Sequence, residues 1–260
     1  MNNLRRYGEA PYRVAVVHGG PGAPGTVAAI ARELAQIRGV LEPLQTKNTV
    51  EGQVAELRET LERYAALPVT LIGHSWGAWL AYIVAARFPG LVRKLILVSS
   101  GPFEAGYVPQ LQANRLARLD PAERTEFTEL LGQLGSAPDP APLMRRLEAL
   151  VEKSDNYETI PIPTDAADVA PANGEQHQGV WAEAAQLRRT GALLDMARLI
   201  TCPVVAIHGD CDPHPALGVK EPLARVIPDF RFCLLEKCGH SPWKERHARD
   251  EFYRILHAEI

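Results

Sequence analysis

The stretch Val69-Thr70-Leu71-Ile72-Gly73-His74-Ser75-Trp76-Gly77 decides the fold of this chain. Its first four residues predict a buried strand, and the run from Trp79 to Ala86 is apolar nearly all round, which predicts a helix inside the domain. A serine at a sharp strand-to-helix turn takes a strained backbone angle, and the residues two positions to either side lie too close to the turn to carry a Cβ. Gly73 and Gly77 meet that requirement. We therefore predict a nucleophile elbow at Ser75, with the amino end of a helix behind it to stabilise an oxyanion.

Strand and helix patterns alternate on both sides of this turn. Strands are expected at residues 13–17, 40–44, 69–72, 94–98, 204–207 and 230–235. Helices are expected at residues 26–37, 50–66, 76–88, 216–226 and 242–257. This alternation predicts an α/β fold, in which helices cover both faces of a mostly parallel sheet.

The alternation stops between Pro102 and Ile200, where no strand pattern is found. Helices are expected from Asp120 onward, at residues 142–152 and at residues 178–197, with an irregular proline-rich stretch at residues 156–174. Because the strand pattern resumes at Val204, an insertion fits better than a separate domain. We expect residues 102–200 to form a helical cap subdomain inserted in a core of residues 1–101 and 201–260.

The composition shows no sign of a nucleic-acid or membrane partner. The chain has 260 residues, is 46% hydrophobic and carries a formal charge of −3, which fits one large domain without a basic surface. It has no apolar run of transmembrane length, and residues 1–13 are polar rather than signal-like, so a cytoplasmic location is expected. The sequence leaves the oligomeric state open.

The cysteines give no sign of a metal site. Four occur, all in the last quarter of the chain and without CxxC spacing, which argues against structural zinc: Cys202, Cys211, Cys233 and Cys238. We expect reduced thiols, with Cys211 and Cys238 on loops near the candidate site.

A serine hydroxyl needs a base to become a nucleophile, and the base needs an orienting partner. Two later loops supply candidates. His208-Gly209-Asp210-Cys211-Asp212 follows one predicted strand, and residues 236–242, which contain His240, follow the next. In a parallel sheet both loops fall on the same edge as Ser75. The order along the chain is serine, acid, histidine.

That order, together with the elbow, resembles the α/β-hydrolase superfamily over nearly the whole chain. The resemblance implies that Ser75 is the nucleophile and that His240 is the general base and acid. The family's acid usually stands three residues after the glycine that closes its strand, here Gly209, which implies Asp212 and leaves Asp210 as the alternative. No metal and no organic cofactor is implied.

The resemblance also implies an oxyanion hole made of two backbone N–H groups. One belongs to the residue after the nucleophile, Trp76. The other comes from the loop His18-Gly19-Gly20-Pro21-Gly22, with Gly20 as the predicted donor and Gly19 as the alternative. Glycine lets the backbone approach a tetrahedral intermediate closely.

His-Gly-Gly-Pro-Gly together with Ser-Trp-Gly-Ala is similar to the proline iminopeptidase branch, which removes amino-terminal proline from peptides. Members of that branch usually have glycine in place of His74, and their sheets begin with an antiparallel hairpin, whereas only twelve residues precede Arg13 here. We therefore expect a sheet that lacks this hairpin. A substrate amine would be bound by acidic groups of the inserted segment, for which the candidates are Glu104, Asp155, Glu158, Glu175 and Glu183.

These features predict a serine hydrolase that cleaves an ester or amide bond of a small molecule or short peptide through an acyl-enzyme. An iminopeptidase-like aminopeptidase and a non-catalytic ligand receptor are the alternatives. Trp76, Trp79 and Trp181 are candidates to line the substrate space, although Trp79 and Trp181 equally suit the core. We expect His74 to pack beside the elbow. The other histidines lack a motif and are expected to be structural: His177, His208, His214, His247 and His257.

One further motif points to another class of protein. The stretch Gly20-Pro21-Gly22-Ala23-Pro24-Gly25 matches the Gly-x-Gly-x-x-Gly of dinucleotide-binding oxidoreductases, and Glu42 stands where a ribose-binding acid is expected. However, Pro21 and Pro24 lack the N–H groups that a pyrophosphate would need. That function also leaves Ser75 without a role, so the hydrolase is the preferred prediction.

Overall fold

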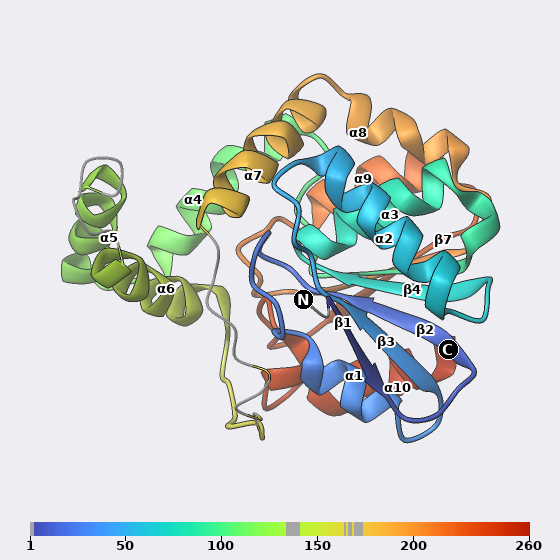
Figure 1. The fold of residues 1–260 in the computed structure, drawn as a ribbon. Coiled ribbons are helices and arrows are strands. Elements are labelled where there is room, and N and C mark those ends of the chain that lie inside the picture. The colour runs from blue at the N-terminus through green and yellow to red at the C-terminus, as the bar shows by residue number, and fades with distance from the viewer. Residues whose placement is uncertain (1–2, 134–140, 164, 166–167, 169–173) are drawn as a thin grey trace.

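The computed structural model describes residues 3–133, 141–163, 165, 168 and 174–260. A seven-stranded sheet with the order β1-β3-β2-β4-β5-β6-β7 forms its centre (Figure 1). The strands are β1 Leu4–Tyr7, β2 Tyr12–Val17, β3 Gly39–Pro43, β4 Val69–His74, β5 Val92–Val98, β6 Val204–Gly209 and β7 Phe230–Leu235. Only the β1–β3 pair is antiparallel. The predicted mostly parallel sheet is therefore present.

Helices cover both faces of this sheet. The helices of the α/β part are α1 Ala28–Leu34, α2 Val50–Tyr64, α3 Trp76–Arg87, α9 Leu217–Val226 and α10 Arg249–Glu259. Figure 1 shows α2, α3 and α9 on one face and α1 and α10 on the other. Every residue of β4 is buried, as its continuous apolar run predicts for a strand covered on both faces.

Each face of the sheet has its own apolar core. One contains Leu71 of β4 and Leu80 of α3, and the other contains Ile72 of β4 and Ile30 of α1. Neighbouring residues of one strand thus point to opposite faces, which is the two-residue period of a strand. The two cores hold the strands in place. The loops that carry the candidate site residues begin at the carboxyl ends of these strands.

The amino-terminal strand β1 corrects the sequence interpretation, in which no strand precedes Arg13. β1 pairs with β3, for example Arg5 with Glu42. It is not one arm of a hairpin with β2, since β3 lies between the two. The Tyr7 hydroxyl donates a 2.7 Å hydrogen bond to Glu42, which joins the two strands by side chains as well. Such long-range pairing leaves no periodic signal in four residues.

Helices and irregular segments occupy the described part of residues 102–200. The helices are α4 Val108–Ala117, α5 Pro121–Gln133, α6 Ala141–Asp155, α7 Gly174–Arg189 and α8 Ala192–Asp195. α4 was not expected from the sequence, and the single helix expected at residues 178–197 is two helices, separated at Gly191, whose φ is +80°. Of the irregular stretch expected at residues 156–174, residues 156–163 form no helix or strand apart from an isolated bridge between Thr159 and Glu245, and residues 164, 166–167 and 169–173 lie outside the described residues.

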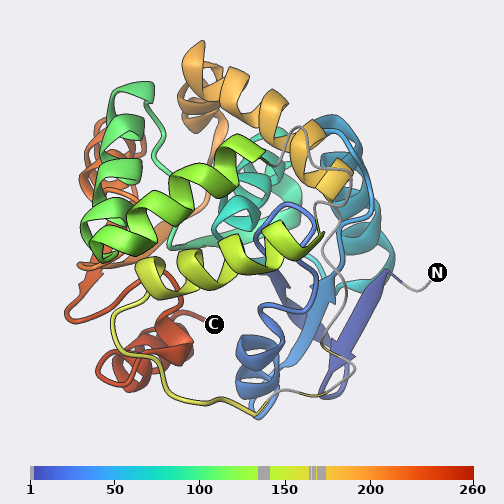
Figure 2. The ribbon, with the colours of Figure 1, turned by 90° about the vertical axis from the view of Figure 1, so that its left-hand side faces the viewer.

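Four of these helices, α4 to α7, lie beside the edge of the sheet where the parallel strands end (Figure 1). α5 and α6 pack on each other around a small apolar core of their own, which includes Phe127 and Leu150. Figure 2, seen from their side, shows α5 and α6 in front of the sheet.

The carboxyl-terminal helix is also shorter than predicted. Pro242–Lys244 form a separate 3₁₀ turn, and α10 begins at Arg249 because Glu245 has an extended backbone. No helix in the described part of the chain combines the length and apolar character needed to cross a bilayer.

Candidate active site

Ser75 stands at the turn between β4 and α3 and has a φ of +55°. An added Cβ on Gly73 would lie 2.1 Å from the carbonyl oxygen of Gly77, and one on Gly77 would lie 2.4 Å from the carbonyl oxygen of Val17. The two flanking glycines are therefore required by close backbone approach, as the motif predicts. Ser75 is half-buried and therefore partly accessible at the end of β4.

Asp212 and His240 meet at the same edge, from the loops that follow β6 and β7. The Nδ1 of His240 lies 2.8 Å from Oδ2 of Asp212. Asp212 is buried and His240 is half-buried. A ring N–H donated from Nδ1 to the carboxylate leaves Nε2 as the basic nitrogen, which is the tautomer a general base needs.

Asp210, the alternative acid, has another partner. It is exposed, and its carboxylate accepts the amide N–H of Cys238. The amide of Cys211 donates to the carbonyl oxygen of Cys238, so the two loops are also joined by their backbones. All four cysteines are free thiols.

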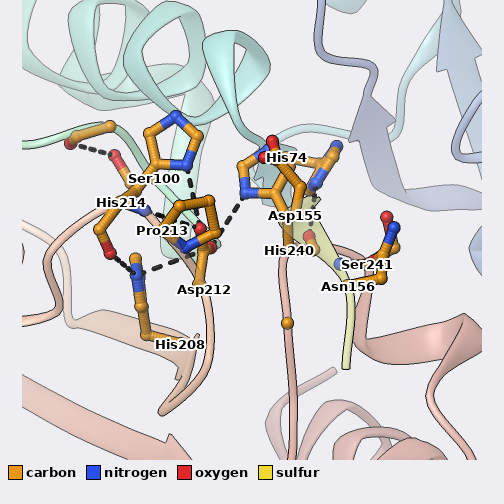
Figure 3. Close-up of polar contacts among 12 residues, drawn as sticks. His74, Ser100, Asp155, Asn156, His208, Asp212, Pro213, His214, His240 and Ser241 are labelled. Atoms are coloured by element: carbon orange, nitrogen blue, oxygen red, sulfur yellow. Dashed lines mark hydrogen bonds and ion pairs between the residues drawn. The ribbon is translucent and has the colours of Figure 1, made fainter. Parts of the chain in front are cut away.

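Two histidines that were expected to be structural also lie against Asp212 (Figure 3). His214 donates its amide N–H to Oδ1, and its Nδ1 lies 2.9 Å from the same oxygen. The Nε2 of His208 lies 3.5 Å from Oδ2 and donates to the carbonyl oxygen of His214. The pattern Asp212-Pro213-His214 carries a signal for this arrangement, because aspartate side chains commonly accept the amide two residues later.

This carboxylate keeps its charge although it is buried. Burial acts to raise the pKa of Asp212, but the neighbouring imidazoles of His240, His214 and His208 hold that pKa well below its ordinary value. Burial acts to lower the pKa of His240, but the Asp212 charge and hydrogen bond outweigh it and raise the pKa above the ordinary value. For His214 burial prevails, and its pKa is lowered.

The loop after β2 brings two glycines beside the elbow. An added Cβ on Gly19 would lie 3.0 Å from the Cβ of Ser75, and one on Gly20, whose φ is +111°, would lie 2.7 Å from Ala23. The predicted loop and the amino end of α3 therefore flank Ser75 from two sides. Their amides are the candidate oxyanion donors.

His18 and Gln45 hold this loop in place. The ring Nε2 of His18 accepts the Gln45 amide, and the His18 carbonyl oxygen accepts the Gln45 side chain at 2.7 Å. Burial lowers the pKa of His18 to about 4, so the ring is neutral and can accept this bond. Nothing in the sequence pointed to Gln45, because its partner His18 follows a different strand.

His74, next to Ser75, packs between His240 and Trp243. Its ring centroid lies 4.8 Å from that of His240, and its Nε2 donates to the carbonyl oxygen of His240 at 3.0 Å. Burial holds the pKa of His74 well below its ordinary value, so the ring is neutral. His74 thus contacts the His240 loop through its ring and one hydrogen bond, in line with the packing role expected for it.

The helical segment contacts the loop of Asp212 through α4 and the residue that follows it. Asn114 donates to the carbonyl oxygen of Pro213, and Arg118 donates to those of Cys211 and Asn156. Arg115 makes a bidentate ion pair with Asp155 at 2.7 and 2.6 Å. One turn of α4 therefore contacts the acid loop and the end of α6.

Glu245 joins the end of α6 to the histidine loop. It is fully buried, and its carboxylate accepts the amides of Tyr157, Glu158 and Gly239. These three hydrogen bonds tie the end of α6 and the histidine loop to one side chain.

Four of the five acids suggested for binding a substrate amine already have partners. Asp155 pairs with Arg115, Glu158 with Arg246 and Glu104 with Arg225. Glu183 accepts the amide of Val50. The side chain of Glu175 lies outside the described residues.

The tryptophans belong largely to the core. Trp76 and Trp79 are buried in the α3 core, where Trp76 donates to Gln53 and Trp79 donates to the Gly101 carbonyl oxygen. Trp181 of α7 stacks on Trp79, with ring centroids 5.8 Å apart. They therefore join α7 to α3.

Glu42 does not fit the dinucleotide hypothesis. It is fully buried between β1 and β3, where it accepts the Tyr7 hydroxyl and lies 3.6 Å from Arg5. Such a residue is closed to a ribose.

Comparison with known proteins agrees with the fold. The chain is 31% identical over 176 residues to a pimeloyl-[acyl-carrier protein] methyl ester esterase of Aromatoleum aromaticum, which covers 66% of each chain. It is 25% identical over 177 residues to the biotin biosynthesis bifunctional protein BioHC of Teredinibacter turnerae, covering 66% of this chain and 30% of that protein. This chain therefore spans less than two thirds of the length of either relative.

Solved structures with the same fold cover nearly the whole chain. VinJ has a TM-score of 0.71 at 19% identity, covering 98% of this chain and 93% of VinJ. A proline iminopeptidase of Mycobacterium smegmatis has a TM-score of 0.64 at 18% identity, covering 98% and 92%. Residues 7–255 match the Alpha/beta hydrolase family. The chain belongs to the alpha/beta hydrolase family.

Proposed function

We propose that this protein is a serine hydrolase in which Ser75, His240 and Asp212 form the catalytic triad. The observation that carries the proposal is the 2.8 Å contact between His240 Nδ1 and the buried Asp212, at the sheet edge where Ser75 stands with a φ of +55°. In the proposed reaction the Ser75 hydroxyl attacks a carbonyl carbon while His240 Nε2 takes its proton. His240 then donates that proton to the leaving group, and water releases the acyl group by the same route.

The negative oxygen of the tetrahedral intermediate would lie between α3 and the loop after β2. The backbone amides of Trp76 and Gly20 are the proposed donors. Gly19, directly beside Ser75, is the alternative to Gly20. Amides fixed in this way stabilise the developing charge without reorganising, and loss of one such donor costs roughly 10²–10³ in turnover in other hydrolases. All the catalytic groups in this scheme are side chains or backbone amides of this chain.

We propose a carboxylic ester of a small molecule as the substrate. The relative from Aromatoleum aromaticum is named as a methyl ester esterase and is 31% identical over the matched part. An aminopeptidase would need a free acidic group for the substrate amine, and the four described candidates are all engaged within the chain. The ester is therefore preferred over the peptide amide.

We further propose that residues 102–200 act as a cap over the site. α4 to α7 lie beside the edge of the sheet that carries Ser75 (Figure 1). Asn114 and Arg118 contact the loop of Asp212 from that side. Side chains of these helices would then set the preference for the acyl and leaving groups.

The test is labelling by a fluorophosphonate, which reacts only with an activated serine. We expect stoichiometric labelling of the natural protein and none of Ser75→Ala or His240→Ala. Ser100→Ala is the matched control, because Ser100 is buried nearby and donates to the Gly101 carbonyl oxygen. It should label like the natural protein.

Short acyl esters and prolyl amides would then be compared as substrates. Faster turnover of the esters supports the proposal, and faster turnover of prolyl amides would favour the aminopeptidase. Folded protein that is neither labelled nor active, yet binds ligands saturably, would favour a receptor.

A further inference from the structure

Asp212 accepts hydrogen bonds from the imidazole rings of two histidines. Its Oδ2 accepts from His240, and its Oδ1 accepts both the amide and the ring N–H of His214. Figure 3 shows the two rings beside each other next to the carboxylate, each joined to it by a dashed line. A triad needs only the first of these contacts, so the role of His214 is unexplained by the proposed reaction.

The rings of His214 and His240 stack on each other. Their centroids lie 4.4 Å apart with an interplanar angle of 22°. Because both Nδ1 atoms face the same carboxylate, both Nε2 atoms point away from it. No hydrogen bond among the described residues uses the Nε2 of His214, whereas its Nδ1, amide and carbonyl oxygen are all engaged.

His214 limits the freedom of the carboxylate. Its two donors fix Oδ1, which leaves Oδ2 for His240. Sharing also has an electrostatic effect, because each N–H donated to the carboxylate draws on the same negative charge. His240 therefore faces a weaker partner than it would if Asp212 had no second ring.

Other charged and titratable groups surround the pair. They are His74 of β4, His208 of β6, Arg115 of α4, Asp155 of α6, Cys238 of the loop after β7 and Lys244 of the turn before α10. His74 and His208 are neutral, since burial lowers the pKa of both. Arg115 and Asp155 form an ion pair with each other, so their charges largely oppose each other at this distance. Among these neighbours, His214 is the one that also donates a hydrogen bond to Asp212, the carboxylate to which His240 donates.

We propose that His214 is a positioning residue which fixes Asp212 for His240 and moderates the basicity of His240. This inference rests on the proposed function, with His240 as the base. Loss of the ring N–H leaves Oδ1 with the backbone amide of residue 214 as its donor, so the carboxylate can move more freely and more of its charge acts on His240. Turnover then falls while the pH needed to deprotonate His240 rises.

The central variant is His214→Phe, which keeps an aromatic ring beside His240 but removes the ring N–H. We expect the acid limb of kcat/KM to move up by about half a pH unit or more, which is about a threefold change in the protonation constant of His240. We also expect kcat to fall. In His214→Gln the amide can still donate to Oδ1, so this variant should recover much of the lost kcat.

His257→Phe on α10 is the matched control, because it makes the same exchange away from Asp212. Thermal unfolding identifies variants that fail to fold. A merely structural role would lower stability and leave the acid limb in place. An unchanged limb in folded His214→Phe, or equal losses in the Gln and Phe variants, would overturn the proposal.

A second measurement does not depend on turnover. Titration of the His240 ring by ¹⁵N NMR should show the same upward shift in His214→Phe. If Ser75→Ala keeps activity, the proposed function fails, yet the shift at His240 would still stand. If the ring of His240 titrates identically in both proteins, the role of His214 fails while the triad remains.

Discussion

The backbone amide of His240 donates a 2.7 Å hydrogen bond to the carbonyl oxygen of Asp155 at the end of α6. The approach is tight, because an added Cβ on Gly239 would lie 2.3 Å from that same oxygen. Ser241 makes a similar contact, since its amide donates to the side chain of Asn156. The end of α6 therefore holds the loop of the proposed base by direct hydrogen bonds.

Replacing each aspartate in turn should show which one, Asp212 or Asp210, is the acid of the triad. Asp212→Asn keeps the shape of the side chain but loses the charge that orients and stabilises the His240 imidazole, so kcat should fall by roughly 10⁴, as in other triads. Asp210→Asn is the matched control on the same loop and should stay within about twofold, a shift below about 0.5 kcal/mol. Steady-state kinetics with a short acyl ester measure both. Equal losses in the two variants would contradict the assignment of Asp212.

The pH dependence should follow His240. Its pKa is raised, because the Asp212 charge outweighs the effect of burial, and the protonated ring cannot act as a base. kcat/KM should therefore fall as the pH drops through a value above about 6.5, the ordinary pKa of histidine. Asp212 stays ionised throughout, since its own pKa is held well below the ordinary range. An acid limb at or below 6.5 would show that the base lies elsewhere.

The same shift predicts a small effect on stability. A histidine whose pKa is raised by folding adds stability below its unfolded pKa, and this is lost as the pH rises through the folded value. In His240→Gln, the decrease in unfolding free energy as the pH rises above about 6.5 should be smaller than in the natural protein. Urea unfolding at a series of pH values measures it, and an unchanged dependence would exclude this contribution.

The ion pair between Arg115 and Asp155 should matter more than a surface pair. Asp155 is buried, so Arg115→Met leaves a carboxylate without its partner, and we expect a loss of about 2–3 kcal/mol of unfolding free energy. kcat should fall as well, because Asp155 holds the His240 loop. Arg146→Met removes an exposed bidentate pair with Glu126 and should cost below about 1 kcal/mol. Similar losses in urea unfolding would contradict the distinction.

The elbow glycines should tolerate no side chain. Gly77→Ala places a Cβ 2.4 Å from the Val17 carbonyl oxygen, so strand or helix must shift, and we expect a loss of at least about 2 kcal/mol. An added Cβ on Gly90 meets nothing within 4 Å, so Gly90→Ala is the control and should be near neutral. Thermal unfolding compares them. A natural melting temperature for Gly77→Ala would mean that the turn is looser than the structure indicates.

The elbow, the alternating strands and the chain order of Ser75, Asp212 and His240 were all readable from short stretches of residues. Buried strands have continuous apolar runs, and the close backbone approach at Ser75 demands glycine at two defined spacings, so each leaves a local pattern. β1 and α4 left no such pattern. Four strand residues are too few to show a period, and the polar residues of α4 that face the loops resemble a solvent-facing surface.

Only the folded arrangement showed which groups surround Asp212 and what holds them. His208, His214 and His240 come from three positions along the chain. His214 and His240 donate to the Asp212 carboxylate, and His208 lies 3.5 Å from it. Contacts such as Arg115 with Asp155 and Gln45 with His18 join residues far apart in sequence. A local pattern records the backbone geometry of its own segment, whereas these contacts depend on how distant segments pack, and no single segment encodes that.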